Sequence, residues 1–211
     1  KTESDLRSIS NNISGSYILL NDITLTSSWN PVDNFNGTID GNGRTIYGLN
    51  PVLNTVNFGL IRYLLPGQST KITNITFNGI EIDTKHGSIG SLVGNMKGGE
   101  LTVENVRISN LDFRSGQFTG GIVGYLGNGS LIISQTSIEG KMTDTGATNP
   151  NGKGGLIGRL LDTNDKTVTV TANSINIDIE IDSQQVDYGD VGSLIGYFET
   201  VQSQSVSFKN I

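Results

Sequence analysis

Pairs of apolar residues enclosed by glycines recur along the chain and predict a stack of similar units. The phrase Gly-Ser-Leu-Val-Gly at 90–94 returns with small changes at 120–124, 154–158 and 192–196, and 58–61 is a looser copy. Successive copies lie 30, 34 and 38 residues apart, a period typical of solenoids. Glycines around a short apolar pair predict a buried strand with tight bends, where the backbone needs positive φ or close approach.

Segments with alternating apolar and polar residues fill the space between the phrases. A first set lies at 72–77, 103–108, 133–138 and 170–175, and a second set includes 80–82, 111–113 and 177–181. Three short strands and three bends in about 30 residues make one coil of a parallel β-helix. We therefore expect an all-β solenoid of about six or seven coils, with inward aliphatic side chains as its core.

Residues 4–13 are the one segment that predicts a helix, because Leu6, Ile9 and Ile13 fall on one face. Ser4 can cap its start and Gly15 can end it. A stack of strands exposes apolar surface and unpaired backbone at its end, so we expect this helix to cap it. The single predicted domain, 1–211, then has a cap over 1–15, opening coils over 16–58 and repeats over 59–211.

The Asp-Gly-Asn-Gly stretch at 40–43 is a dense turn signal. A hairpin from Ile39 to Ile46 and a solenoid corner both fit it locally, and the downstream repeats favour the corner.

Amide side chains recur at one offset of the aligned strands, namely Asn74, Asn105 and Gln135. Stacked amides can hydrogen-bond along the axis of a solenoid. The same alignment places Ala172 in the fourth copy, where it would interrupt such a ladder.

Composition narrows the choice of partners and setting. The net charge of −6 disfavours nucleic acid, and no apolar stretch approaches the length of a membrane span. With no cysteine, the 211 residues can form neither disulfides nor thiolate sites. No signal peptide starts at Lys1 and the sequence stops within a repeat, so we expect a fragment of a longer chain.

The opening of the chain resembles that of GLUG-repeat β-helix proteins. The resemblance lies in Tyr17-x-Leu-x-Asn-Asp22-Ile-x-Leu, Trp29-x-Pro31 and Phe35-x-Gly-Thr-Ile-Asp-Gly-Asn-Gly-x-Thr-Ile46-x-Gly-Leu49. The glycine phrases resemble the GLUG motif itself, and together these stretches cover nearly the whole chain. Similar segments occur in large secreted or wall-anchored bacterial proteins, including adhesins, and as accessory regions of IgA-cleaving metallopeptidases. The resemblance implies a right-handed parallel β-helix, an extracellular or cell-surface location and no catalytic residue.

Catalytic signals are sparse. His86 is the single histidine, so neither a Ser/His/Asp set nor a zinc cluster can be assembled. Signatures of polygalacturonase-like β-helix enzymes are missing. Glu81 and Asp112 could lie on adjacent coils, but a spacing of roughly 4.8 Å brings surface acids together in any solenoid. The sequence predicts that the chain is not an enzyme and has no cofactor.

Calcium is the metal best matched by the sequence, because carboxylate oxygens are its preferred ligands. The candidate ligands are Asp178, Glu180 and Asp182 on one strand, and Asp187 and Asp190 in the following loop. A solvated acidic strand face that discourages edge pairing explains the same pattern and is the favoured interpretation.

Insertions at 144–152 and 183–190 lengthen the later repeats, and solenoid insertions often carry the binding face. The candidate binding residues are Asp144, Thr148, Asn149, Asn151, Gln184, Gln185, Asp187 and Tyr188.

The predicted function is non-enzymatic adhesion or display on a bacterial surface, with an extracellular protein or glycan as partner. A carbohydrate-binding or carbohydrate-cleaving β-helix is an alternative. An ice-binding solenoid is a further one, suggested by Thr167, Thr169 and Thr171, although Glu104 and Arg107 interrupt the hydroxyl array on an aligned strand.

Overall fold

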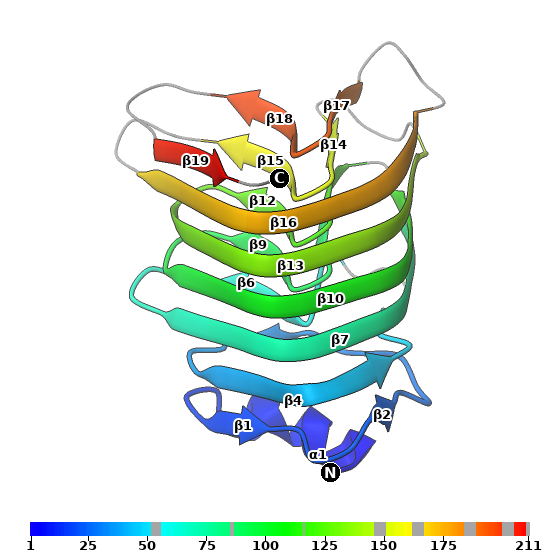
Figure 1. Cartoon of the computed structure of the whole chain (residues 1–211), viewed down its shortest axis with the longest axis vertical. Coiled ribbons are helices and arrows are strands. Elements are labelled where there is room, and N and C mark those ends of the chain that lie inside the picture. The colour runs from blue at the N-terminus through cyan, green and yellow to red at the C-terminus, as the bar shows by residue number, and fades with distance from the viewer. Residues whose placement is uncertain are drawn as a thin grey trace.

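Three parallel sheets wind around one core in the computed structural model (Figure 1). The structure describes residues 1–51, 56–84, 87–115, 117–145, 151–161, 167–183, 189–199 and 205–209. The long sheet has the order β1-β4-β7-β10-β13-β16-β19, with β2 beside β4. Its strands are β1 Ser16–Ile18, β2 Ile23–Thr24, β4 Thr38–Tyr47, β7 Ser69–Thr84, β10 Glu100–Ser115, β13 Gly129–Asp144, β16 Val168–Ser183 and β19 Ser205–Lys209.

Two sheets of short strands complete each coil. The second sheet contains β5 Asn57–Phe58, β8 Ser88–Gly90, β11 Phe118–Gly120, β14 Asn151–Gly154 and β17 Gly189–Gly192. The third sheet contains β3 Val32–Asp33, β6 Ile61–Leu64, β9 Val93–Met96, β12 Val123–Leu126, β15 Ile157–Leu161 and β18 Ile195–Glu199. The pairings between neighbouring coils are parallel, so the predicted parallel β-helix is confirmed. The long sheet's main path crosses seven strands, in agreement with six or seven coils.

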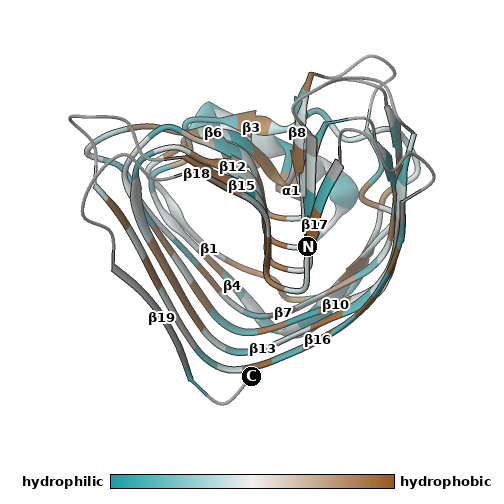
Figure 2. Cartoon of the chain, turned by 90° about the horizontal axis from the view of Figure 1, so that it is seen from above, coloured by the Kyte–Doolittle hydropathy of each residue, from teal (hydrophilic) through white to brown (hydrophobic). Residues whose placement is uncertain are grey.

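The glycine phrases lie where the second sheet turns into the third. Figure 2 shows the chain running toward the middle of the coil and then back outward. A methyl group on the last glycine of each phrase would lie less than 3.0 Å from backbone atoms of the second sheet, as at Gly94, Gly124, Gly158 and Gly196. None of these four glycines has positive φ. Close backbone approach is therefore the reason for glycine here. The apolar pair is not a strand of its own, because its first residue lies in the bend and its second begins a strand of the third sheet.

Each full-length strand of the long sheet contains both strands that the sequence predicts separately. In β7 the chain bends at Asn74 and at Gly79, which have φ of 52° and 71°. Asparagine and glycine adopt this left-handed conformation most readily. The bends let one strand of sixteen residues wrap around the core.

The predicted amide ladder exists, but its fourth member was misplaced. Asn105 Nδ2 donates to Asn74 Oδ1 at 2.9 Å, and Gln135 occupies the same position one coil later. Ala172 is not opposite Gln135, because it pairs with Ile133 and Ser174 occupies the bend at φ 55°. The inward alternation of buried Val168, Val170 and Ala172 sets this register.

The Asp-Gly-Asn-Gly stretch is a bulge within β4 and not a hairpin. Thr38–Asp40 pair with β1 and Ile46–Tyr47 with β2, both in parallel. The register against β7 shifts between Asp40 and Arg44. The solenoid interpretation of this stretch is therefore confirmed.

A short helix covers the N-terminal end, as predicted, but it is shorter than residues 4–13. It consists of α1 (Glu3–Arg7) and the 3-10 helix η1 (Ser8–Asn11). Thr2, not Ser4, is the N-cap, because its side chain and that of Asp5 form a capping box. Leu6 and Ile9 are buried in the first coil. No helix within the described residues is long and apolar enough to cross a membrane.

Candidate functional site

A column of aromatic, amide and cationic side chains runs across the coils on the third sheet. Residues in the same register position are Tyr63, Asn95, Tyr125, Arg159 and Tyr197. Their neighbours Leu64, Met96, Leu126 and Leu160 are fully buried. Because side chains alternate across a strand, the column residues face outward, and all five are partly exposed. We call these five residues together with Phe118 the aromatic–arginine column.

Arg159 is the centre of the column. Its guanidinium carbon lies 4.7 Å from the ring centre of Phe118, 5.6 Å from that of Tyr125 and 5.1 Å from that of Tyr197. The rings of Phe118 and Tyr125 also contact each other, with centroids 6.1 Å apart. Cation–π contacts of this kind contribute about 0.5–2 kcal/mol each. The contacts hold the charged group in one position on the outer face.

Polar groups extend the column toward the N-terminal coils. Lys97 Nζ lies 4.5 Å from the ring centre of Tyr63, and Asn57 Nδ2 donates to the Tyr63 hydroxyl at 3.1 Å. Asn95 Oδ1 is buried and has no hydrogen-bond partner among the described residues. The face thus offers ring surfaces and a fixed cation, a combination suited to a ligand with both apolar and polar groups.

A polar cleft lies on the long sheet at the first bend. Its cavity volume is about 350 Å³. The lining includes the ladder residues Asn74, Asn105 and Gln135, and beside them Arg107 and Ser137. Asn74 Nδ2 continues the ladder by donating to Asp40 Oδ1 at 3.1 Å.

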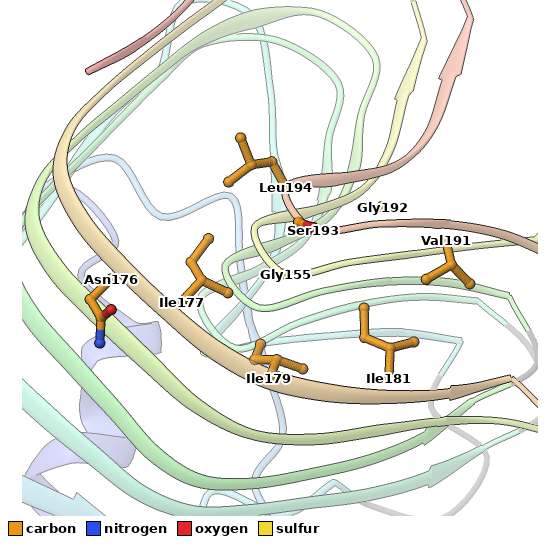
Figure 3. A pocket seen from close by; sticks show the side chains of 9 residues that line it. All are labelled: Gly155, Asn176, Ile177, Ile179, Ile181, Val191, Gly192, Ser193 and Leu194. Carbon is orange, nitrogen blue, oxygen red and sulfur yellow. The ribbon is translucent and has the colours of Figure 1, made fainter. Parts of the chain in front are cut away.

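An apolar cavity of about 710 Å³ lies at the last coils (Figure 3). Ile177, Ile179 and Ile181 line it from β16, Val191 lines it from β17, and Leu194 lines it from the turn between the second and third sheets. In the described residues, β19 covers only Thr169–Asn173 of β16. The cavity is therefore a continuation of the solenoid core.

A buried ion pair lies inside the coil formed by β13 and β14. Lys153 Nζ is 3.6 Å from Asp144 Oδ1, and the two side chains are 1 % and 0 % exposed. Lys153 also donates to the carbonyl of Gln117 at 2.7 Å. Burial lowers the pKa of Lys153 to about 8, although the Asp144 carboxylate opposes that shift.

Of the predicted calcium ligands, three lie on β16, and two of them face a lysine. Lys141 Nζ lies 3.2 Å from Glu180 and 3.8 Å from Asp182, and Asp178 is exposed on the same face. Asp190 lies on β17, and Asp187 lies outside the described residues. The part of the chain that the structure describes contains no group of three or more His, Cys, Asp or Glu that could hold a metal ion.

The predicted binding residues are mostly outside the described ranges, namely Thr148, Asn149, Gln184, Gln185, Asp187 and Tyr188. Asn151 is the first residue of β14. Asp144 is fully buried against Lys153, so its side chain is not exposed for an external ligand. That the insertions at 144–152 and 183–190 carry the binding face therefore stays a prediction.

The sequence interpretation did not identify the aromatic–arginine column, although the sequence contains a signal for it. Asn95, Tyr125, Arg159 and Tyr197 each directly follow the last glycine of a phrase. Aligning the four phrases and continuing by one residue would have placed these side chains above one another. Their different chemical types hide the repeat.

Comparison with known proteins shows the fold. The sequence matches no protein-family model and no curated protein. The structure is similar to the crystal structure of a "putative immunoglobulin A1 protease" from Bacteroides ovatus, with a TM-score of 0.60 and 15 % sequence identity. The match covers 99 % of this chain and 72 % of that chain. At this identity the likeness shows a shared fold, and membership of the GLUG family stays a prediction.

The prediction that the chain is not an enzyme is contradicted by this comparison, because the similar structure is named as a protease. That prediction was based on missing catalytic motifs. The absence of these motifs excludes only the reaction types that were searched for. An enzyme can also carry its catalytic residues in a part of the protein outside the β-helix.

Proposed function

We propose that the chain is the extracellular recognition module of a bacterial surface or secreted protein. In this proposal the aromatic–arginine column contacts the ligand, an extracellular glycoprotein, and the rigid solenoid displays it. The observation that carries the proposal is the alignment of Tyr63, Tyr125, Arg159 and Tyr197 on one outer face.

The side chains of the column are those that contribute most at protein interfaces. Tyrosine and arginine are enriched among residues whose truncation weakens binding most. Arg159 is already held by three rings, so little side-chain entropy remains to be lost on binding. Parallel strands on both sides keep the spacing of the column fixed.

The recognition module serves an enzyme in this proposal. Support comes from the similarity to a structure named as an immunoglobulin A1 protease. A β-helix that binds the substrate raises its concentration at a catalytic centre elsewhere in the protein. Immunoglobulin A1, a glycoprotein, is therefore the first ligand to test.

Binding of this chain to immobilised immunoglobulin A1, measured by biolayer interferometry, tests the proposal. We expect saturable binding, and about thirtyfold weaker binding for Arg159→Met and for Tyr125→Ala, the loss typical of a central interface residue. Arg114→Met and Tyr47→Ala are matched controls, because these side chains are exposed on the long sheet. No binding, or equal losses in the controls, contradicts the proposal.

A second candidate function is glycan binding in the polar cleft, which is favoured by its row of amides beside Arg107. A glycan array with released-product assays tests it. Binding lost in Asn105→Ala but kept in Arg159→Met assigns the ligand to the cleft, and product release identifies a carbohydrate-cleaving enzyme.

A further inference from the structure

The buried ion pair of Lys153 and Asp144 occupies positions at which the neighbouring coils carry uncharged residues. In register with Lys153, the neighbouring strands carry Thr119 and Val191. In register with Asp144, they carry Ser115 and Ser183. Ionisable side chains thus enter this corner in one coil, whereas the coils on both sides use uncharged residues.

Two opposite charges in a dry interior are costly. Each loses its hydration, and their mutual attraction often fails to compensate. Lys153 is 1 % exposed and Asp144 is 0 % exposed, so water does not solvate either group. A neutral form of the pair removes this cost.

We propose that Lys153 and Asp144 react with each other to form an intramolecular amide bond. Transfer of one proton from the ammonium to the carboxylate gives an amine and a carboxylic acid. Lys153 Nζ then bonds to Asp144 Cγ, one C–O bond of the carboxylic acid breaks, and the oxygen leaves as water. The reaction consumes nothing outside the pair, and no atom is oxidised or reduced.

The surroundings of the pair favour this reaction. The gap of 3.6 Å from Nζ to Oδ1 places the nitrogen directly beside the carboxyl group that it would attack, and groups held together in this way react with high effective molarity. The carbonyl of Gln117 accepts a hydrogen bond from Nζ at 2.7 Å and fixes its position. Lowering of the Lys153 pKa by burial increases the share of nucleophilic amine.

A hydroxyl group lies near the pair without a visible role. The Thr119 Oγ1 atom is buried and has no hydrogen-bond partner among the described residues. Thr119 lies directly beside Lys153 in the register of β11 and β14. A hydroxyl there can donate a hydrogen bond to the carbonyl oxygen of the new amide.

The bond would close a covalent ring that contains residues 144–153. A cross-link between two points of a chain stabilises the folded state by restricting the unfolded one. Because the chain contains no cysteine, a disulfide cannot do so here.

Intact-mass spectrometry of the purified chain tests the proposal. We expect a mass lower than the sequence mass by one water. In a tryptic map, Asp144 and Lys153 lie on one peptide, so we expect residues 142–159 to stay uncleaved after Lys153 and to be lighter by one water. Lys153→Arg and Asp144→Ala should each restore the sequence mass. The control is the pair of Lys141 and Glu180, which lies at 3.2 Å but is exposed, so those peptides should stay separate.

Wild-type protein at the full sequence mass, after prolonged incubation, overturns the proposal. A water loss that persists in Lys153→Arg, or that maps to other residues, overturns it equally. Because the wild-type measurement alone decides, the proposal stays falsifiable even if a variant does not fold.

Discussion

At the scale of single residues, the last glycine of each phrase determines whether the coil can close. At Gly124, a methyl group would collide with the backbone nitrogen of Ile89 and lie 2.6 Å from the carbonyl carbon of Ser88. Backbone atoms cannot move aside as a flexible side chain can. We therefore expect Gly124→Ala to lower the free energy of unfolding by about 3 kcal/mol, at the upper end of ordinary overpacking, as measured by urea denaturation. Gly79→Asn is the control, because Asn110 already occupies the equivalent bend at φ 53°. Equal destabilisation by the two substitutions would contradict this account of the phrase.

At the scale of elements, Glu3 joins the capping helix to the first coil. Its carboxylate accepts hydrogen bonds from the backbone and side chain of Thr26 and from Arg7, which lower its pKa from 4.5 to about 2. A carboxyl with a lowered pKa stabilises the fold above its unfolded pKa and loses that contribution as pH falls. We expect stability to decrease between pH 4.5 and pH 2, and Glu3→Gln to weaken this dependence in thermal melts. Glu81→Gln, on the exposed face of β7, is the matched control for the loss of one surface carboxylate. An unaltered acid response of Glu3→Gln would exclude the proposed link.

The elements also show how much of the fold and of the candidate site could be predicted from the sequence. Glycine periodicity identified the parallel β-helix, because a motif imposed by backbone packing has to recur in every coil. The register of the fourth coil was wrong because Ala172 and Ser174 are both small, and only the inward alternation distinguishes them. The sequence could not decide whether the glycines of the phrases provide positive φ or allow close backbone approach, because glycine meets both requirements. The aromatic–arginine column was missed because outward positions are free to vary in chemistry.

At the scale of the whole molecule, stability should fall from the middle coils toward the last described ones. β10 pairs with β7 and with β13 along nearly its whole length. In contrast, β19 pairs with β16 only from Thr169 to Asn173, and the described residues place no strand over its second half. A solenoid derives much of its stability from contacts between neighbouring units, so local opening should be easiest where one neighbour is missing.

In native-state hydrogen exchange we expect β10 amides to exchange slowest. Amides of Asn176–Asp182 that point away from β13 should exchange faster than those of Thr169–Asn173. Uniform protection along β16 would mean that its second half is covered, and would contradict the gradient. The comparison within one strand keeps sequence composition and pH the same, so that a difference reports the missing neighbour.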